Sequence, residues 1–442
     1  MNSDRLSIAR SLLEQRRFKA ATRKLKKRTS LSEELLYSEL LVMQNKSQIA
    51  LNHLKSLLRL YPQASTVILK KQPTILQALG HVEAANELSC QLARENTNDI
   101  LGYLSHLQNG FDPVIELNAS LENTLKSNYE DPYVKGVAAY CLFNVKKDDS
   151  KYDYLHEGAK LIRSTIQYHH DANIQNIRSI ANYFPVKTND QDQITQYRSP
   201  IFIVGMPRSG TTLLEQMLGS HSKTLAVGES VNMGRIFAKH GLDSKGNINL
   251  SETDFAKART EYLTLTYGED SNKRTIVDKM PNNFIYVGFI LSLFPNAKVI
   301  YSGRDPIDNC FSIYRAVFQK NRHKYSYNQT ELADYQISCK YLMDMWIRKY
   351  PNNILNVKYE CLVKDTEKEL RKLVGFCELG WEEVCLDFHK NKNVVHTLSA
   401  HQVKKPVHSS SVGAGMRLLP YLSELAERLG VEANKTGIVR QT

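Results

Sequence analysis

The chain has 442 residues, of which 42% are hydrophobic and 24% are charged, a balance typical of a folded globular protein with room for two or three domains. The net charge of +12 favours an anionic partner such as a nucleotide, a nucleic acid, an acidic peptide or a membrane surface. Seven cysteines are scattered without a C-x-x-C pair, which argues against a disulfide framework and a zinc site.

The N-terminal residues lack the apolar core of a signal peptide, and no apolar run along the chain reaches membrane-spanning length. We therefore expect a cytoplasmic protein without a membrane partner. The basic run 23–28 has the composition of a nucleic-acid patch, but no DNA- or RNA-binding motif accompanies it. We interpret this run as a solvated helix face and expect no nucleic-acid partner.

Residues 1–188 are predicted to form a helical domain, because Gly and Pro are sparse and apolar residues recur at helical spacing. Ala50 and Leu54 are matched 34 residues later by Ala84 and Leu88, and this offset is the tetratricopeptide period. The match is degenerate, so the prediction is a tetratricopeptide-like domain, with an irregular helical domain as the alternative.

The segment 189–199 is polar and rich in turn-forming residues, and we interpret it as a linker. Over residues 199–442, short apolar runs alternate with helical patterns. This alternation predicts an α/β domain with a mostly parallel sheet and helices on both faces. The expected strands cover residues 201–204, 275–278, 297–301 and 354–359. Ligands of such sheets bind at the carboxyl ends of the strands.

The segment 201–218 combines a strand, a glycine-containing loop and the start of a helix. This geometry directs backbone N–H groups and the positive end of a helix dipole at one place, where an anion binds. Arg208 adds a permanent charge and a forked donor set that suits phosphate or sulfate oxygens. The other residues of the predicted anion site are Ser209, Gly210, Thr211 and Thr212.

The spacing of Gly205 and Gly210 is also that of a nucleotide-hydrolysing P-loop, but Thr211 stands where that motif has its lysine. The P-loop lysine contacts the β- and γ-phosphates during phosphoryl transfer. A nucleotide kinase is therefore disfavoured, whereas binding of phosphate or sulfate is retained. A tight turn without any ligand is the remaining alternative for this loop.

The run 207–213, Pro-Arg-Ser-Gly-Thr-Thr-Leu, resembles the 5′-phosphosulfate loop of sulfotransferases that use 3′-phosphoadenosine-5′-phosphosulfate (PAPS). The groups it resembles are the protein-tyrosine sulfotransferases and the bacterial sulfotransferases that carry tetratricopeptide repeats. The resemblance covers about residues 200–413 and implies a P-loop-like fold, PAPS as co-substrate and adenosine 3′,5′-bisphosphate as product. The histidines show no metal-ligand spacing, so we expect no metal.

Three further motifs follow in the order of that family. Glu229 occupies the position of the family's base, which takes the proton of the acceptor hydroxyl. Lys279 resembles the family's lysine at the sulfuryl group and leaving phosphate, where a fixed cation lowers the barrier. Arg304 and Ser312 match the 3′-phosphate motif. Without the resemblance, these residues would be a helix-start carboxylate, a strand-end lysine and a capped turn.

The segment 399–413 resembles the C-terminal loop of the repeat-containing sulfotransferases. In it, Ser399 matches a family serine near the reacting group, and Lys405 is a candidate nucleotide contact. Family members usually continue with Arg-Trp-Arg, whereas this chain has Ala-Gly-Met at 414–416 and only then Arg417. The departure implies altered closure over PAPS unless a nearby cation such as Lys405 or Arg417 substitutes.

The leading hypothesis is transfer of the sulfuryl group of PAPS to an acceptor hydroxyl, with Glu229 as base and with Arg208 and Lys279 stabilising the transferred group. A tyrosine in a peptide or protein is the leading acceptor, because helical repeats hold polypeptides. A carbohydrate or small-molecule hydroxyl stays open as an acceptor, and the sequence allows an oligomer. The alternative from another class is a repeat-based peptide-binding protein with a degenerate sulfotransferase domain.

Overall fold

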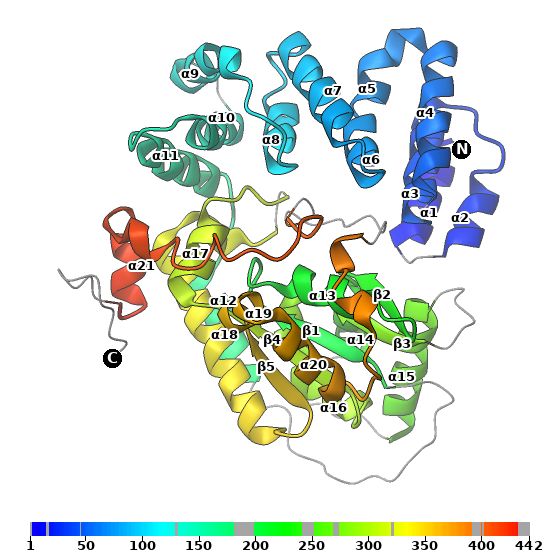
Figure 1. Cartoon of the computed structure of the whole chain (residues 1–442), viewed down its shortest axis with the longest axis vertical. Helices are drawn as coiled ribbons and strands as arrows, with labels where there is room; N and C mark the ends of the chain where they lie inside the picture. The colour runs from blue at the N-terminus through cyan, green and yellow to red at the C-terminus, as the bar shows by residue number, and fades with distance from the viewer. Residues whose placement is uncertain are drawn as a thin grey trace. The chain divides into compact units, whose positions relative to one another are not determined.

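The computed structural model of the chain is shown in Figure 1. It describes residues 2–14, 17–44, 46–128, 131–180, 199–240, 252–267, 274–319, 322–390, 399 and 402–431. The predicted linker lies outside these ranges except for its last residue, Ser199.

The chain separates into two compact units. The first unit comprises Met1–Leu161, Tyr267–Ser271 and Lys392–His401. The second unit comprises Ile162–Thr266, Asn272–Asn391 and Gln402–Thr442. The domain limits at 188 and 199 stay predictions.

The first unit is built from helices, in agreement with the helical pattern of its sequence. In chain order they are α1 (Asn2–Glu14), α2 (Phe18–Lys24), α3 (Leu31–Met43), α4 (Ser47–Leu60), η1 (Pro62–Ala64), α5 (Ser65–Leu69), α6 (Gln72–Ala78), α7 (Val82–Glu95), α8 (Ile100–Gln108), η2 (Ile115–Leu117), α9 (Asn118–Lys126), α10 (Pro132–Val145) and α11 (Lys151–Ser164). Neighbouring helices pack in pairs, such as α1 with α2, α3 with α4 and α6 with α7.

The repeat spacing in this unit differs from the predicted one by a residue. Helix α4 begins at Ser47 and α7 begins at Val82, 35 residues later. Ala50 is fully buried, but Ala84 is exposed, and the neighbouring Ala85 takes the buried position. The 34-residue alignment therefore pairs the wrong alanines, since it is burial between paired helices that requires the small side chain. The tetratricopeptide character stays a prediction.

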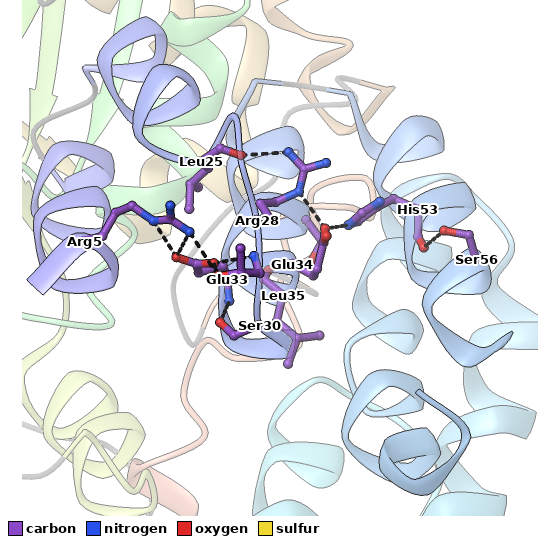
Figure 2. A network of polar contacts seen from close by, with 11 residues as sticks. Arg5, Leu25, Arg28, Ser30, Glu33, Glu34, Leu35, His53 and Ser56 are labelled. Carbon is purple, nitrogen blue, oxygen red and sulfur yellow. Dashed lines mark hydrogen bonds and ion pairs between the residues drawn. The ribbon is translucent and has the colours of Figure 1, made fainter. Parts of the chain in front are cut away.

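Buried and half-buried ion pairs fasten the first helices of this unit (Figure 2). Glu33, only 1% exposed, accepts from Arg5 Nε at 2.6 Å. Burial opposes ionisation of Glu33, yet the bonds from Arg5 and Thr29 hold its pKa below the ordinary value. Arg28 Nε donates to Glu34 Oε2 at 2.6 Å, and its guanidinium lies 3.9 Å from the centre of the Tyr37 ring.

This network corrects the interpretation of the basic run 23–28 as a solvated helix face. Helix α2 ends at Lys24, so the run continues into the turn that follows. Lys26 and Lys27 are exposed, as expected, but Arg28 is half-buried and engaged by Glu34. The last cation of the run therefore contributes to helix packing.

The second unit is organised around a five-stranded sheet in which every neighbouring pair is parallel. The strands are β1 (Ile201–Gly205), β2 (Thr224–Gly228), β3 (Thr275–Lys279), β4 (Lys298–Gly303) and β5 (Ile354–Lys358), in the order β2-β3-β1-β4-β5. Helices cover both faces of this sheet (Figure 1). The predicted mostly parallel α/β fold is confirmed, and β2 is an additional strand over the apolar run that precedes Glu229.

The helices of the second unit precede the first strand, connect successive strands or follow the last strand. They are α12 (His170–Ile180), α13 (Thr211–Gly219), α14 (Asn232–His240), α15 (Glu252–Tyr267), η3 (Pro281–Tyr286), α16 (Val287–Leu293), α17 (Pro306–Tyr314), η4 (Lys324–Tyr327), α18 (Gln329–Lys349), α19 (Tyr359–Lys364), α20 (Thr366–Phe376), η5 (Glu383–Cys385), η6 (Phe388–Lys390), η7 (Met416–Tyr421) and α21 (Ser423–Arg428). Within the ranges that the structure describes, no helix is long and apolar enough to span a membrane.

The strand order places a topological switch point between β1 and β4. From β1 the chain moves to β2 and β3 on one side of β1, whereas β4 and β5 lie on the other side. Connections that leave in opposite directions open a crevice at the carboxyl ends of the two central strands, where ligands of such folds bind. Two predicted motifs, the 205–210 loop and the turn at Arg304, follow β1 and β4 and meet there.

Candidate functional site

The loop after β1 has a backbone that only its glycines allow. Gly205 and Gly210 have φ angles of 144° and 107°, in the region that disfavours other residues. A Cβ atom on Gly205 would lie 2.8 Å from the carbonyl oxygen of Ser302, and one on Gly210 would lie 2.7 Å from Tyr359 Cδ2. The loop therefore fits closely against β4 and the residue that follows β5.

The carbonyl groups of this loop are bound by side chains from β4 and the turn and helix after it. Ser302 Oγ donates to the Ser209 carbonyl at 2.9 Å. Asn309 Nδ2 donates to the Pro207 carbonyl at 2.8 Å, and Arg304 Nη1 donates to the Arg208 carbonyl at 2.9 Å. These three bonds fix the loop and help hold Arg208 at a φ of 65°, an unusual value for a residue with a side chain.

Helix α13 begins at this loop without a side-chain cap. Its N-cap residue is Gly210, which has no side-chain oxygen to accept from the first-turn N–H groups. Thr211 and Thr212 are buried at the start of the helix. An anion at this helix start would meet the positive end of the helix dipole.

Cations converge on the same place. The half-buried Arg208 donates through Nε to Ser312 Oγ at 3.3 Å and through Nη2 to Gln402 Oε1 at 3.2 Å. Burial and the nearby charges of Arg315 and Arg304 lower the pKa of Arg208 to about 10. Arg208 is thus still charged at neutral pH, and the mutual repulsion of these cations favours binding of an anion.

Arg304 is held by oxygen atoms that carry no net charge. Its Nη1 and Nη2 atoms donate to the carbonyl groups of Arg208 and Ser411, the latter at 3.0 Å, and its Cζ lies 4.7 Å from the centre of the Tyr359 ring. Its Nε is buried and has no hydrogen-bond partner within the described residues. A buried donor of this kind needs a partner, and a phosphate oxygen would provide one.

A second group of charges lies at the carboxyl ends of β2 and β3. The Lys279 side chain is fully buried, and its Nζ lies 2.8 Å from Glu229 Oε1 and 3.7 Å from Glu215 Oε2. Glu229 is 28% exposed and also lies 3.5 Å from Nη1 of Arg322. The structure thus brings the predicted base and the predicted lysine into direct contact, and Glu229 keeps a path to solvent.

Asp278 precedes Lys279 on β3 and is likewise fully buried. Burial raises the pKa of Asp278 to about 7, although the Tyr262 hydroxyl donates to its Oδ2 at 2.7 Å. Its Oδ1 has no partner within the part of the chain that the structure describes. Asp278 therefore tends to hold a proton near neutral pH.

The predicted residues of the C-terminal segment fall in different units of the chain. Ser399 belongs to the first unit, and Lys405 belongs to the second, where its side chain is exposed. Lys404 is half-buried, and burial lowers its pKa. The nucleotide role of Lys405 stays a prediction.

Sequence reasoning missed several residues of the site. They are Glu215, which contacts Lys279, and Gln402, Asn309, Asp308 and Tyr359, which contact the loops. Asn309 and Asp308 lie inside the motif that contains Arg304, so their proximity in sequence was a usable signal. Gln402 lies inside the segment 399–413, whose resemblance to the family's C-terminal loop was a usable signal, whereas no predicted motif contains Tyr359 as a site residue. Over the described residues, no cluster of three or more His, Cys, Asp or Glu suits a metal ion.

Part of the chain is similar to known proteins. Residues 200–383 match the model of the sulfotransferase family. An uncharacterized protein of Aquifex aeolicus is 30% identical, with 89% of this chain and 54% of the relative covered. The protein-tyrosine sulfotransferase of Drosophila melanogaster is 26% identical, with 53% of this chain and 50% of the relative covered. The chain thus spans about half the length of these two relatives.

Among solved structures, the sulfotransferase domain of the Synechococcus PCC 7002 olefin synthase is similar, with a TM-score of 0.39 and 22% identity. The match covers 55% of this chain and all of that domain.

Proposed function

Because residues 200–383 form a sulfotransferase-family domain, we propose that this chain transfers the sulfuryl group of PAPS to an acceptor hydroxyl. The observation that supports this most is the convergence of Arg208 and Arg304 on the uncapped start of α13, at the switch point of the sheet. Two cations beside a helix start suit a ligand with two separate anionic groups. PAPS carries such groups at its 5′ and 3′ positions.

The two ends of the nucleotide would be held by different residues. The 205–212 loop, with Arg208, would bind the 5′-phosphosulfate through backbone N–H groups, hydroxyl groups and the guanidinium. Arg304 and Ser312 would bind the 3′-phosphate, and the unpartnered Nε of Arg304 supports this role. In the structure, Ser312 accepts from Arg208, so the two subsites are adjacent.

The transfer itself is a displacement at sulfur. A bond forms between the acceptor oxygen and sulfur while the bond from sulfur to the 5′-phosphate oxygen breaks. Glu229, half-buried but open to solvent, would take the proton of the acceptor hydroxyl. Lys279, in contact with Glu229 at 2.8 Å, would stabilise the negative charge that develops on the departing phosphate.

We propose a peptide or protein tyrosine as the acceptor. The relatives named protein-tyrosine sulfotransferase support this choice. A carbohydrate or small-molecule hydroxyl remains the competing acceptor. Transfer of labelled sulfate from PAPS to a panel of tyrosine peptides, sugars and phenols distinguishes these classes.

The first test is calorimetric titration of the full chain with adenosine 3′,5′-bisphosphate and with 5′-AMP, in the absence of metal. We expect the bisphosphate to bind at least about 100-fold more tightly, because in this proposal Arg304 and Ser312 bind the 3′-phosphate, which 5′-AMP lacks. Arg304→Ala should abolish this preference. Arg371→Ala, which removes an exposed arginine paired with Glu367, should leave it unchanged.

A failure to bind the bisphosphate would contradict the proposal. It would favour the alternative of a repeat-based peptide-binding protein with a degenerate sulfotransferase domain. If the nucleotide binds, Glu229→Gln should retain that binding and lose turnover. Retained turnover would exclude Glu229 as the base.

A further inference from the structure

Resting on the proposed function, we infer that Asp308 is a positioning residue for nucleotide binding. It fastens a C-terminal segment, residues 411–415, to the start of α17 and thereby orients Arg304. We call this segment the clamp segment. It contains the position at which the chain departs from the Arg-Trp-Arg pattern.

Two short hydrogen bonds make the fastening. Asp308 Oδ2 accepts from the Gly413 N–H at 2.6 Å, and Oδ1 accepts from the Gly415 N–H at 2.6 Å. Asp308 is 2% exposed, so both bonds are shielded from water. Hydrogen bonds to an ionised carboxylate are shorter and stronger than those between neutral groups. The backbone N–H of Asp308 is itself bonded to the Asp305 carboxylate, which caps α17 and fixes the helix start.

The glycines of the clamp segment make this contact possible. Gly413 has a φ of 71°, which places its N–H toward the same carboxylate as that of Gly415. A Cβ atom on Gly415 would lie 2.7 Å from Ile307 Cγ2 and 2.8 Å from the Ile307 carbonyl oxygen. A larger residue at 415, as in the family pattern, does not fit this arrangement. Glycine at position 415, where the family pattern has a tryptophan, therefore allows the clamp segment to pack directly on α17.

The clamp segment reaches the proposed 3′-phosphate site through Ser411. The Ser411 carbonyl accepts from Arg304 Nη2 at 3.0 Å, and its hydroxyl is hydrogen-bonded to the Tyr359 hydroxyl at 3.0 Å. The ring of Tyr359 in turn stacks on the Arg304 guanidinium. Asp308 thus acts on Arg304 from the other end of the same segment.

In this arrangement, Asp308 holds the segment that lacks the cation and the aromatic residue of the family pattern. In the resembled family, the Arg-Trp-Arg positions lie in the loop that closes over the nucleotide. Here a carboxylate on the protein holds the segment, through the hydrogen bonds from Gly413 and Gly415. Asp308 stabilises the orientation of Arg304 through this segment and is a positioning residue.

The test compares Asp308→Asn with wild type in the full chain. The amide offers one acceptor oxygen where the carboxylate offers two, so one of the two glycine N–H groups loses its partner. We expect adenosine 3′,5′-bisphosphate to bind about 10- to 100-fold more weakly, with 5′-AMP binding unchanged. The KM for PAPS should rise while kcat at saturating PAPS changes little. Without ligand, amide hydrogen exchange of residues 411–415 should become faster.

A second variant reaches the same segment independently. Gly415→Ala introduces the clash with Ile307 and should displace the segment, with the same selective loss of bisphosphate binding. The double variant should be no weaker than the more affected single variant, because both changes release the same contact. Matched controls are Gly375→Ala, where a Cβ meets no atom within 4 Å, and Asp344→Asn on α18, where the half-buried carboxylate pairs with Lys340.

The outcomes separate this inference from the proposed function. If wild type prefers the bisphosphate and Asp308→Asn keeps the full preference, the positioning role is wrong while the proposed function stands. Equal weakening of bisphosphate and 5′-AMP would also contradict it, because it would indicate general damage to the fold. If wild type shows no preference, the proposed function and the role of Asp308 both fail.

Discussion

At the scale of single residues, the site contains a buried lysine that lies beside two carboxylates. Lys279 is fully buried between two carboxylates, those of Glu229 and Glu215. Two acidic neighbours hold the position of this buried cation. The lysine is therefore ready to face a developing negative charge without rearrangement of its surroundings.

Replacing this lysine should impair the chemical step more than nucleotide binding. We expect Lys279→Met to lower kcat by about 100- to 1,000-fold, the range for loss of one donor at a developing oxyanion. Because the change leaves Glu215 buried without its cation, the variant should also unfold at lower temperature. The double variant Lys279→Met/Glu215→Gln should recover stability and not kcat. Recovery of both would show that the lysine acts only through folding.

Asp278 gives stability a pH dependence of unusual sign. Its folded-state pKa of about 7 lies above the ordinary value of 3.8, so the folded state keeps a proton that the unfolded state loses. The free energy of unfolding should therefore fall as pH rises from about 4 to about 7, and no further change from this group follows above that window. This trend is opposite to that of a salt-bridged aspartate.

Asp278→Asn removes this dependence, because an amide does not ionise and its oxygen still accepts from Tyr262. Urea unfolding at pH 5 and at pH 8 measures the free energy of unfolding of both proteins. The value of the variant relative to that of wild type should rise between these pH values by on the order of a few kcal/mol. Asp344→Asn, a change at a half-buried carboxylate of α18 that pairs with Lys340, is the control and should show no such rise. An equal difference at both pH values would mean that Asp278 is ionised throughout.

The contacts of the site were predictable only in part from the sequence. Glu229, Lys279, Arg208 and Ser312 stand in recognisable motifs, and the structure brings them together in two contacting pairs. Their catalytic and binding roles stay predictions. Gln402 lies in the segment 399–413 that resembles the family's C-terminal loop, but its contact with Arg208 was not predicted, because the two residues are 194 positions apart. Such a contact depends on the three-dimensional course of the C-terminal segment, which no local pattern encodes.

At the scale of elements, the strand–loop–helix unit around Gly210 combines two separate constraints. Its φ of 107° disfavours any residue with a side chain, and the Tyr359 ring occupies the space where a Cβ would lie. The second constraint joins the loop after β1 to the residue after β5. A defect at Gly210 should therefore affect both the helix start and the stacking of Tyr359 on Arg304.

Gly210→Ala should destabilise the chain by about 1–3 kcal/mol and should abolish binding of adenosine 3′,5′-bisphosphate. Gly430→Ala is a matched control, since Gly430 has a φ of 68° and open space around it. Chemical denaturation of both variants separates the backbone strain that they share from the clash that only Gly210→Ala adds. Unchanged nucleotide binding in Gly210→Ala would contradict the assignment of this loop as the phosphosulfate site.

How readily a strand could be predicted from the sequence depended on how fully the strand is buried. Parallel strands buried on both faces appear as continuous apolar runs, and β1 is such a run with all five residues buried. β2 is less evident, because only two of its five residues are buried. The structure assigns it through its ladder with β3, a long-range pairing that a short half-buried segment does not reveal by itself.

At the scale of the whole molecule, a helical pattern predicts a helix without saying which unit it joins. The sequence places residues 170–180 in the N-terminal helical domain, but α12 packs on α18 and belongs to the second unit. Ile174 and Ile177 are buried, His170 Nε2 lies 3.0 Å from Asp334 Oδ2, and the preceding Arg163 pairs with Glu331 through two hydrogen bonds. An amphipathic stripe has the same spacing whichever surface covers it.

From the position of α12 we predict which N-terminal truncation leaves the second unit stable. A chain that begins at Ile162 should be more stable than one that begins at Ser199, because the shorter chain loses two buried isoleucines and exposes the face of α18. Burying one such side chain contributes about 1.5–3 kcal/mol, so the shorter chain should melt at least about 5 °C lower.

Thermal unfolding followed by circular dichroism measures the difference between these two chains. Glu331→Gln in the longer chain is the matched variant, because it removes the paired charge of Arg163 and keeps α12. It should account for only a small part of the loss, since a partly exposed ion pair contributes about 1 kcal/mol or less. Equal melting temperatures for the two chains would instead place the domain limit near residue 199, as the sequence predicts. In that case the packing of α12 on α18 would contribute little to the stability of the second unit.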